Sequence, residues 1–73
     1  MRYSLTAVLR REGDWYVAHC PELDIASQGD SLEEAKRNLR EAVEGFLECA
    51  PADEVAARLQ GDVFVSGLEV VVA

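Results

Sequence analysis

One amphipathic segment in the middle of the chain constrains the fold more than any other feature. Ser31-Leu32-Glu33-Glu34 matches a capping box, in which the Ser31 side chain caps a helix and Glu34 reaches back to the backbone. Apolar residues then recur at spacings of three and four, at Leu32, Ala35, Leu39, Ala42, Val43, Phe46 and Leu47. We therefore predict one long helix from about Leu32 to Cys49, with a single apolar stripe.

The chain before this helix has the pattern of a β-hairpin followed by a short strand. Between Arg2 and Arg10 the residues alternate, which is the two-residue period of a strand, with one apolar face made by Tyr3, Leu5, Ala7 and Leu9. A second strand is expected in the aromatic and branched run that starts at Trp15, after a polar loop that contains Gly13. We expect a short third strand from Asp24 to Gln28.

The run from Val63 to Val72 predicts a last strand that is apolar on both faces. Phe64, Leu68, Val70 and Val72 share one face, and the other carries Val63, Val65 and Val71. A strand of this kind needs cover on both sides. One long helix covers only one face of a small sheet, so the second face must meet a short helix expected at Ala52–Gln60, another copy of the chain, or a different protein.

The element order β-β-β-α-β predicts the fold class. A helical crossover usually returns a strand parallel to one already in the sheet, which places the last strand beside the first. A chain of 73 residues has room for one domain only, and it buries just ~60% of its unfolded surface. We predict a single α+β domain over residues 1–73, with the helix layered on one face of the sheet.

The charge balance narrows the class of partner. The chain carries 14 acidic and 7 basic residues, for a net charge of −7. Direct nucleic-acid binding relies on neutralising phosphates with basic side chains, so this domain is a poor candidate for it. An acidic surface fits a basic protein partner, or else it serves only to keep the chain in solution.

The two cysteines, Cys20 and Cys49, lie far apart in a chain with no secretory leader pattern and no apolar run of ~18 residues. This usage is typical of a reduced, cytoplasmic protein.

Two stretches of the chain together resemble the HicB antitoxin family of type II toxin–antitoxin systems. The first runs from Gly13 to Leu23 and includes Trp15-Tyr16-Val17-Ala18 and Pro21-Glu22-Leu23; the second runs from Ser27 to Ala35 and includes Gly29-Asp30-Ser31. Each motif is weak alone, but their order and separation are fairly specific. The resemblance extends through the helix and the last predicted strand.

This resemblance implies a partial ribonuclease H-like fold and a partner, the HicA toxin, which is a small basic ribonuclease that cleaves messenger RNA. Proteins of the HicB type bind that toxin and block it. The chain departs from the family pattern at Leu23-Asp24-Ile25, where many members have Leu-Pro-Gly. It also ends at Ala73 without the C-terminal DNA-binding segment of full-length members, so we do not expect it to repress its own operon.

Enzymatic alternatives remain open but have little support in the residues. A two-metal nuclease needs carboxylates clustered on adjacent strands, whereas Glu22, Asp24 and Asp30 fall in loops or at element ends. A Cys/His pair or a zinc site would need His19, Cys20 and Cys49 to converge, although neighbours on a strand point to opposite faces. We expect no cofactor, no metal and no catalysis.

The function that we expect is therefore binding of another polypeptide. The residues that we assign to partner binding lie in the hairpin, the following turn and the last strand: Trp15, Tyr16, Glu22, Val63, Val65 and Val71. The alternatives are an orphan domain that only associates with copies of itself, and a metal-dependent nuclease remnant. A homo-oligomer is compatible both with the antitoxin function and with the orphan domain.

Overall fold

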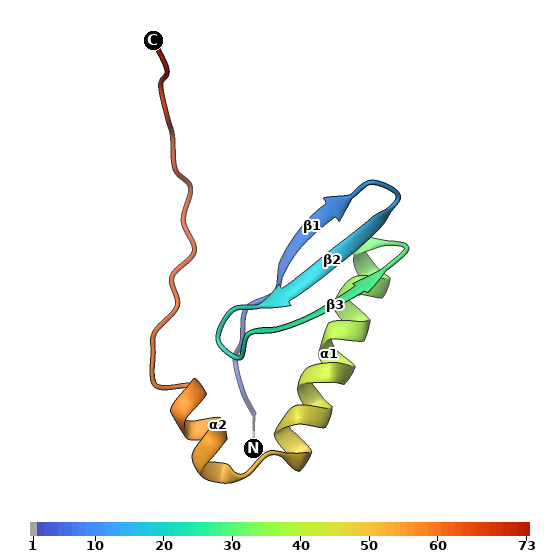
Figure 1. Ribbon diagram of the computed structural model, residues 1–73, viewed down its shortest axis with the longest axis vertical. Coiled ribbons are helices and arrows are strands. Elements are labelled where there is room, and N and C mark those ends of the chain that lie inside the picture. Colours follow the sequence, from blue (N-terminus) through green and yellow to red (C-terminus); the bar gives the residue numbers. More distant parts are fainter. Residues whose placement is uncertain (1) are drawn as a thin grey trace.

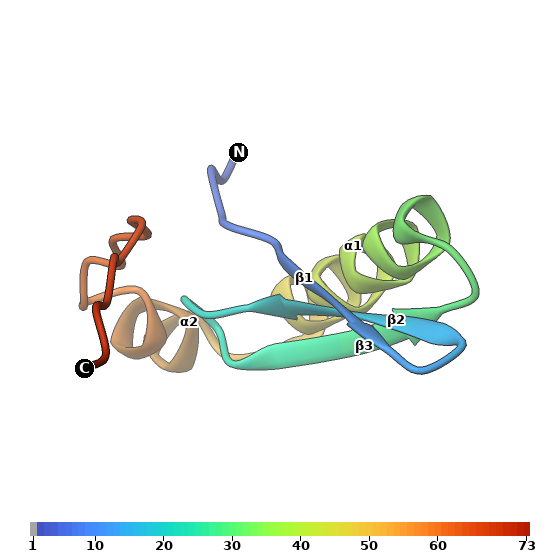
Figure 2. The ribbon, with the colours of Figure 1, turned by 90° about the horizontal axis from the view of Figure 1, so that it is seen from above.

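A computed structural model describes residues 2–73 and shows a three-stranded sheet with a long helix across one face (Figures 1 and 2). The elements in chain order are β1 (Val8–Glu12), β2 (Trp15–Cys20), β3 (Ile25–Gly29), α1 (Leu32–Cys49) and α2 (Ala52–Arg58). Both strand pairs are antiparallel, and the sheet order is β1-β2-β3. The predicted α+β class, the three strands and both helices are confirmed.

A tight turn sets the register of the β1–β2 hairpin. Glu12 pairs with Trp15, so the loop between the strands holds only Gly13 and Asp14. Gly13 has φ 59°, the positive value that a type II′ turn requires at its first loop position and that glycine adopts without strain.

The helix α1 starts with the predicted cap. Ser31 Oγ accepts a hydrogen bond of 3.1 Å from the Glu34 N–H, and Glu34 Oε1 accepts one of 3.1 Å from the Asp30 N–H. The return contact thus goes to the residue before the cap rather than to Ser31 itself. The first bond satisfies an N–H group that a helix start leaves without an intrahelical partner, and the second ties the preceding residue to the first turn.

The core lies between α1 and the face of the sheet that it covers. Its buried residues come from β2, the β2–β3 loop and the apolar stripe of α1: Ala18, Cys20, Leu23, Ala35, Leu39 and Val43. The small side chains of Ala18 and Ala35 are fully buried, which allows α1 to approach the sheet closely.

The short helix α2 is tied to this core by Arg58. One guanidinium nitrogen of Arg58 donates a 2.6 Å hydrogen bond to the Leu23 carbonyl, and another lies 3.3 Å from Glu54 Oε1. The same guanidinium stacks over the Phe46 ring at 4.8 Å from its centroid. These contacts fix α2 beside the β2–β3 loop and set the direction in which the chain leaves it.

The prediction that residues 63–72 form a fourth strand beside the first, as in a partial ribonuclease H-like fold, is wrong for the described residues. This segment has no strand pairing and runs away from the body of the molecule (Figure 1). Phe64, Leu68 and Val71 are 88%, 87% and 96% exposed. The physical reason is that α2, held by Arg58, directs the chain away from β1, so the segment meets no strand with which to pair.

The first strand is also shorter at its start than the predicted Arg2–Arg10. Residues 2–7 are not in the sheet, because β1 begins where Val8 pairs with His19, close to the end of β2 at Cys20. Leu5 and Ala7 still pack against the core. Within the described residues, no helix is both long and apolar enough to cross a membrane.

We predict opposite effects for two glycine-to-alanine substitutions. A Cβ at Gly29 would lie 2.6 Å from the Ala35 backbone nitrogen, so Gly29→Ala forces α1 away from β3 and should lower the free energy of unfolding by about 1–3 kcal/mol. A Cβ at Gly45, inside α1, meets nothing within 4 Å, so Gly45→Ala should raise it by about 0.5–1 kcal/mol. Urea denaturation measures both, and equal effects of the two variants would contradict this packing.

Candidate protein-interaction surfaces

The face of the sheet opposite α1 has no element over it in residues 2–73, as Figure 2 shows. Side chains alternate along each strand, and Ala18 and Cys20 point into the core, so their strand neighbours point the other way. The pairing register then identifies the residues of this surface, which we call the open face: Val8, Arg10, Glu12, Trp15, Val17, His19, Ala26 and Gln28.

The open face mixes apolar and polar side chains: Val17 lies in its middle between Arg10 and Gln28, and Trp15 lies at its hairpin end beside Glu12. Trp15 is 49% exposed and Val8 is 43% exposed. Arg10 contacts Glu12 at 2.6 Å, and His19 Nε2 lies 3.0 Å from Asp24 Oδ1. Both contacts are exposed and contribute little to stability. Exposed aromatic and aliphatic side chains beside polar groups are typical of protein interfaces.

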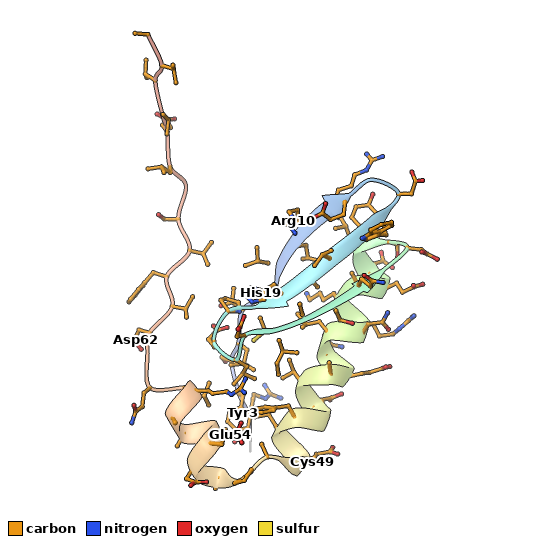
Figure 3. All side chains as sticks on the ribbon, viewed as in Figure 1. Tyr3, Arg10, His19, Cys49, Glu54 and Asp62 are labelled. Atoms are coloured by element: carbon orange, nitrogen blue, oxygen red, sulfur yellow. The ribbon has the colours of Figure 1, made fainter. Side chains whose placement is uncertain are left out.

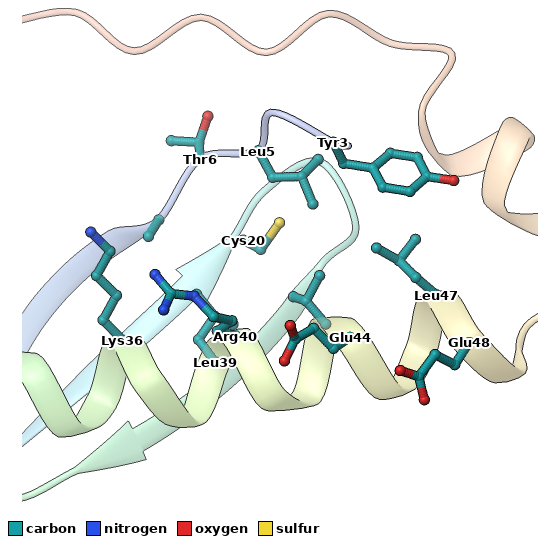
Figure 4. Close-up of a pocket in the computed structure, with 12 residues that line it drawn as sticks. Tyr3, Leu5, Thr6, Cys20, Lys36, Leu39, Arg40, Glu44, Leu47 and Glu48 are labelled. Atoms are coloured by element: carbon teal, nitrogen blue, oxygen red, sulfur yellow. The ribbon is translucent and has the colours of Figure 1, made fainter. Parts of the chain in front are cut away.

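A second surface is a groove of about 510 Å³ between residues 3–7 and the side of α1 (Figure 4). Leu5 and Tyr3 line it from one side, Leu39, Val43 and Leu47 from α1, and Cys20 lies at its base. Lys36, Arg40, Glu44 and Glu48 add charges of both signs along its helical wall. Sequence patterns did not reveal this groove. A fourth strand was expected beside the first strand, and the groove is open because no described residue fills that position.

The residues assigned to partner binding from the sequence do not form one site. Trp15 lies on the open face, whereas Tyr16 points to the covered face and packs against the core. Glu22 lies in the turn after β2. Val63, Val65 and Val71 lie on the extended C-terminal segment, which leaves the body beyond Asp62 (Figure 3).

Glu22 fastens the N-terminal residues to the turn after β2. Its carboxylate accepts hydrogen bonds from the Thr6 N–H at 3.0 Å and from the Thr6 hydroxyl at 2.6 Å. Partial burial acts to raise the pKa of Glu22, but the bonds from Thr6 outweigh it and hold that pKa below its ordinary value of 4.5. The role that the geometry gives Glu22 is to hold one wall of the groove in place.

The side chains with nucleophilic or metal-binding chemistry are dispersed. Cys20 is buried, and desolvation raises the pKa of its thiol, while its neighbour His19 points to the open face. Cys49 is exposed at the end of α1. Among residues 2–73, no three His, Cys, Asp or Glu side chains come together in a way that suits a metal ion.

The chain resembles two bacterial proteins along nearly its whole length. It is 36% identical over 70 residues to a UPF0150 protein of Helicobacter pylori strain J99, covering 94% of this chain and 97% of that protein. The chain belongs to the UPF0150 family. It is also 38% identical over 72 residues to the UPF0150 protein ssr1765 of Synechocystis, covering 96% of this chain and 90% of that relative.

No family model and no solved structure matches this UPF0150 chain. The names of the two UPF0150 relatives specify neither an activity nor a partner.

The Thr6–Glu22 contact predicts a pH dependence of stability. Because the folded state lowers the pKa of Glu22, the stabilisation is complete above pH 4.5 and is lost as the pH falls through the lower folded pKa. Glu22→Gln and Thr6→Val should both weaken this loss of stability on acidification, while Thr6→Ser, which keeps the hydroxyl, should retain it. Urea unfolding between pH 3 and 6 measures the effect, and an unchanged acid dependence in Glu22→Gln would rule it out.

Proposed function

We propose that this UPF0150 protein is a HicB-like antitoxin, a binding module without catalysis that occludes a small basic ribonuclease of the HicA type. The observation that carries the proposal is the open face, which exposes Trp15 and Val8 and which nothing in residues 2–73 covers. The resemblance of Trp15-Tyr16-Val17-Ala18 and Gly29-Asp30-Ser31 to HicB motifs supplies the class of partner.

The open face has the properties of a partner surface rather than of a solvated one. Trp15 is a large, rigid side chain of the type that dominates binding energy at interfaces. Val17 adjoins Trp15 on β2, and Val8 adds a second exposed apolar side chain at the other end of β1. Arg10, Glu12 and His19 add polar groups to the same face. A partner that covers the sheet would give these strands the second layer that the chain itself does not supply.

Charge favours a basic partner. The chain has a net charge of −7, and α1 carries exposed carboxylates at Glu33, Glu41, Glu44 and Glu48. Opposite net charges accelerate encounter between two proteins and lose their effect as salt concentration rises. Charge therefore accelerates the encounter with the partner, while the affinity comes from the apolar side chains of the open face, Trp15 above all.

Inhibition by this module is steric. A protein interface of ordinary size buries about 800 Å² on each partner. On a small ribonuclease, coverage of that extent removes the RNA-binding surface and the catalytic histidine from solvent. The antitoxin needs no chemistry of its own for this, which fits the dispersed positions of Cys20, His19 and Cys49.

Co-expression with the product of the adjacent open reading frame tests this proposal, since a HicA-type toxin is a small basic protein. The two proteins should co-purify, and the chain should restore growth to cells that express that neighbour. Trp15→Ala should weaken binding at least tenfold, because it removes the large exposed aromatic side chain of the open face. Leu32→Ala is the matched control, since Leu32 is 51% exposed but lies at the start of α1, outside the open face. No complex and no growth rescue would refute the proposal.

We also propose that the chain associates with copies of itself. The supporting observation is the C-terminal segment, defined as residues 63–72, whose large apolar side chains are exposed and outside the open face. The two proposals use different residues, so an antitoxin that is also an oligomer satisfies both.

A further inference from the structure

The C-terminal segment has the pattern of a strand without a sheet. Its large side chains include Phe64, Leu68, Val70, Val71 and Val72, which are between 72% and 96% exposed. The segment continues away from α2 with no pairing to any other described part of the chain (Figure 1). Extended apolar backbone of this kind gains stability by pairing with the edge of a sheet.

The surface area of the molecule shows that the segment is out of place in a monomer. A compact protein of 8.0 kDa exposes about 4,400 Å². The described chain exposes 5925 Å², which is about 1,500 Å² more. A standard interface buries about 800 Å² on each partner and obligate homodimers bury more, so an excess of about 1,500 Å² per chain is of the size that an obligate dimer removes.

The groove beside residues 3–7 is a seat of matching length. Its helical wall runs from Lys36 to Glu48, which spans ~18 Å along α1. A strand of five or six residues spans about the same distance. The groove also offers apolar contacts at Leu5, Leu39 and Leu47, as Figure 4 shows.

The sheet edge next to this groove is unpaired. In the described sheet β1 is an outer strand, and every second residue of β1 directs its N–H and C=O away from β2. A strand laid in the groove would run beside residues 3–7, which lead into β1, and on along the free edge of β1, while its inner side chains packed on α1.

Charges on the segment and on the edge are complementary. Residues 2–12 carry Arg2, Arg10 and Arg11 against one acidic residue, Glu12, whereas residues 63–72 carry Glu69 and no basic residue. Segment and edge are present in every copy of the chain. In a pair of copies, each segment can therefore contact the edge of the other chain. Because the same contact is made twice, the assembly closes as a symmetric dimer.

From these observations we infer that the C-terminal segment of one chain lies in the groove of a second copy and adds a fourth strand to the edge of its β1. The exchange is reciprocal, and each sheet gains an apolar strand supplied by the other chain. This inference rests on the proposed self-association and specifies its contact.

Light scattering with variants is the first part of the test. The full chain should be a dimer at micromolar concentration. Leu68→Asp places a charge in the apolar contact and should raise the dissociation constant at least tenfold. Gln60→Asp, which adds the same charge before the segment, is the control and should leave the dimer intact. A wild-type monomer overturns both self-association and the exchange; a dimer unaffected by Leu68→Asp overturns the exchange alone.

Photo-cross-linking then determines which chain receives the segment. A photoreactive p-benzoyl-phenylalanine replaces Leu68, which lies farther along the segment than Phe64, and chains labelled with ¹⁴N and ¹⁵N are mixed, unfolded and refolded together. Cross-links to residues 2–11 or to the groove side of α1 that join peptides of different isotope composition support the exchange. Cross-links that join only peptides of the same isotope show the segment folded back on its own chain, and cross-links elsewhere show a different contact; either result overturns it.

Discussion

A single amphipathic helix can cover one face of a sheet and no more, and the architecture of this protein depends on that constraint. The helix α1 packs its stripe of Ala35, Leu39 and Val43 against the face formed by Ala18 and Cys20. Gly29 lets the helix start approach within contact of β3, and Arg58 fixes α2 at the end of the layer. All the cover that the chain supplies is then used on one side, which leaves the open face and the C-terminal segment exposed.

The two exposed surfaces suit different roles. The open face is a pre-formed surface that exposes Trp15. Surfaces of this type bind a folded partner with little rearrangement. The C-terminal segment is extended and needs a sheet edge, which is the kind that adds a strand to another molecule. Assembly through the segment leaves the open face of each copy available, so one chain can serve both as a subunit and as an inhibitor.

Short sequence patterns predicted the elements that contacts between residues close in sequence determine, which are α1 and the β1–β2 hairpin. The capping box at Ser31 and the three-and-four spacing after it specify α1 to the residue, and the glycine loop at Gly13 specifies the hairpin. The position of the last strand was not predictable in this way. It depends on the direction set by Arg58 and its partners Leu23 and Phe46, which are 35 and 12 residues away in the sequence, and no periodicity encodes such contacts. The candidate surfaces followed the same division: Trp15 was identified from its strand, while Tyr16 faces the core and the groove was not foreseen.

The central claim is that this chain is an incomplete β-structure that another polypeptide completes. Hydrogen exchange of the backbone amides of residues 63–72 in the purified full-length protein tests it most directly, because an amide exchanges slowly only when it is held in a hydrogen bond. If a second chain pairs with the segment, the amides of alternate residues should be protected from exchange. That protection should be lost on dilution below the dissociation constant of the assembly. Exchange at the rate of an unstructured peptide at all concentrations, with or without the basic partner, would contradict it.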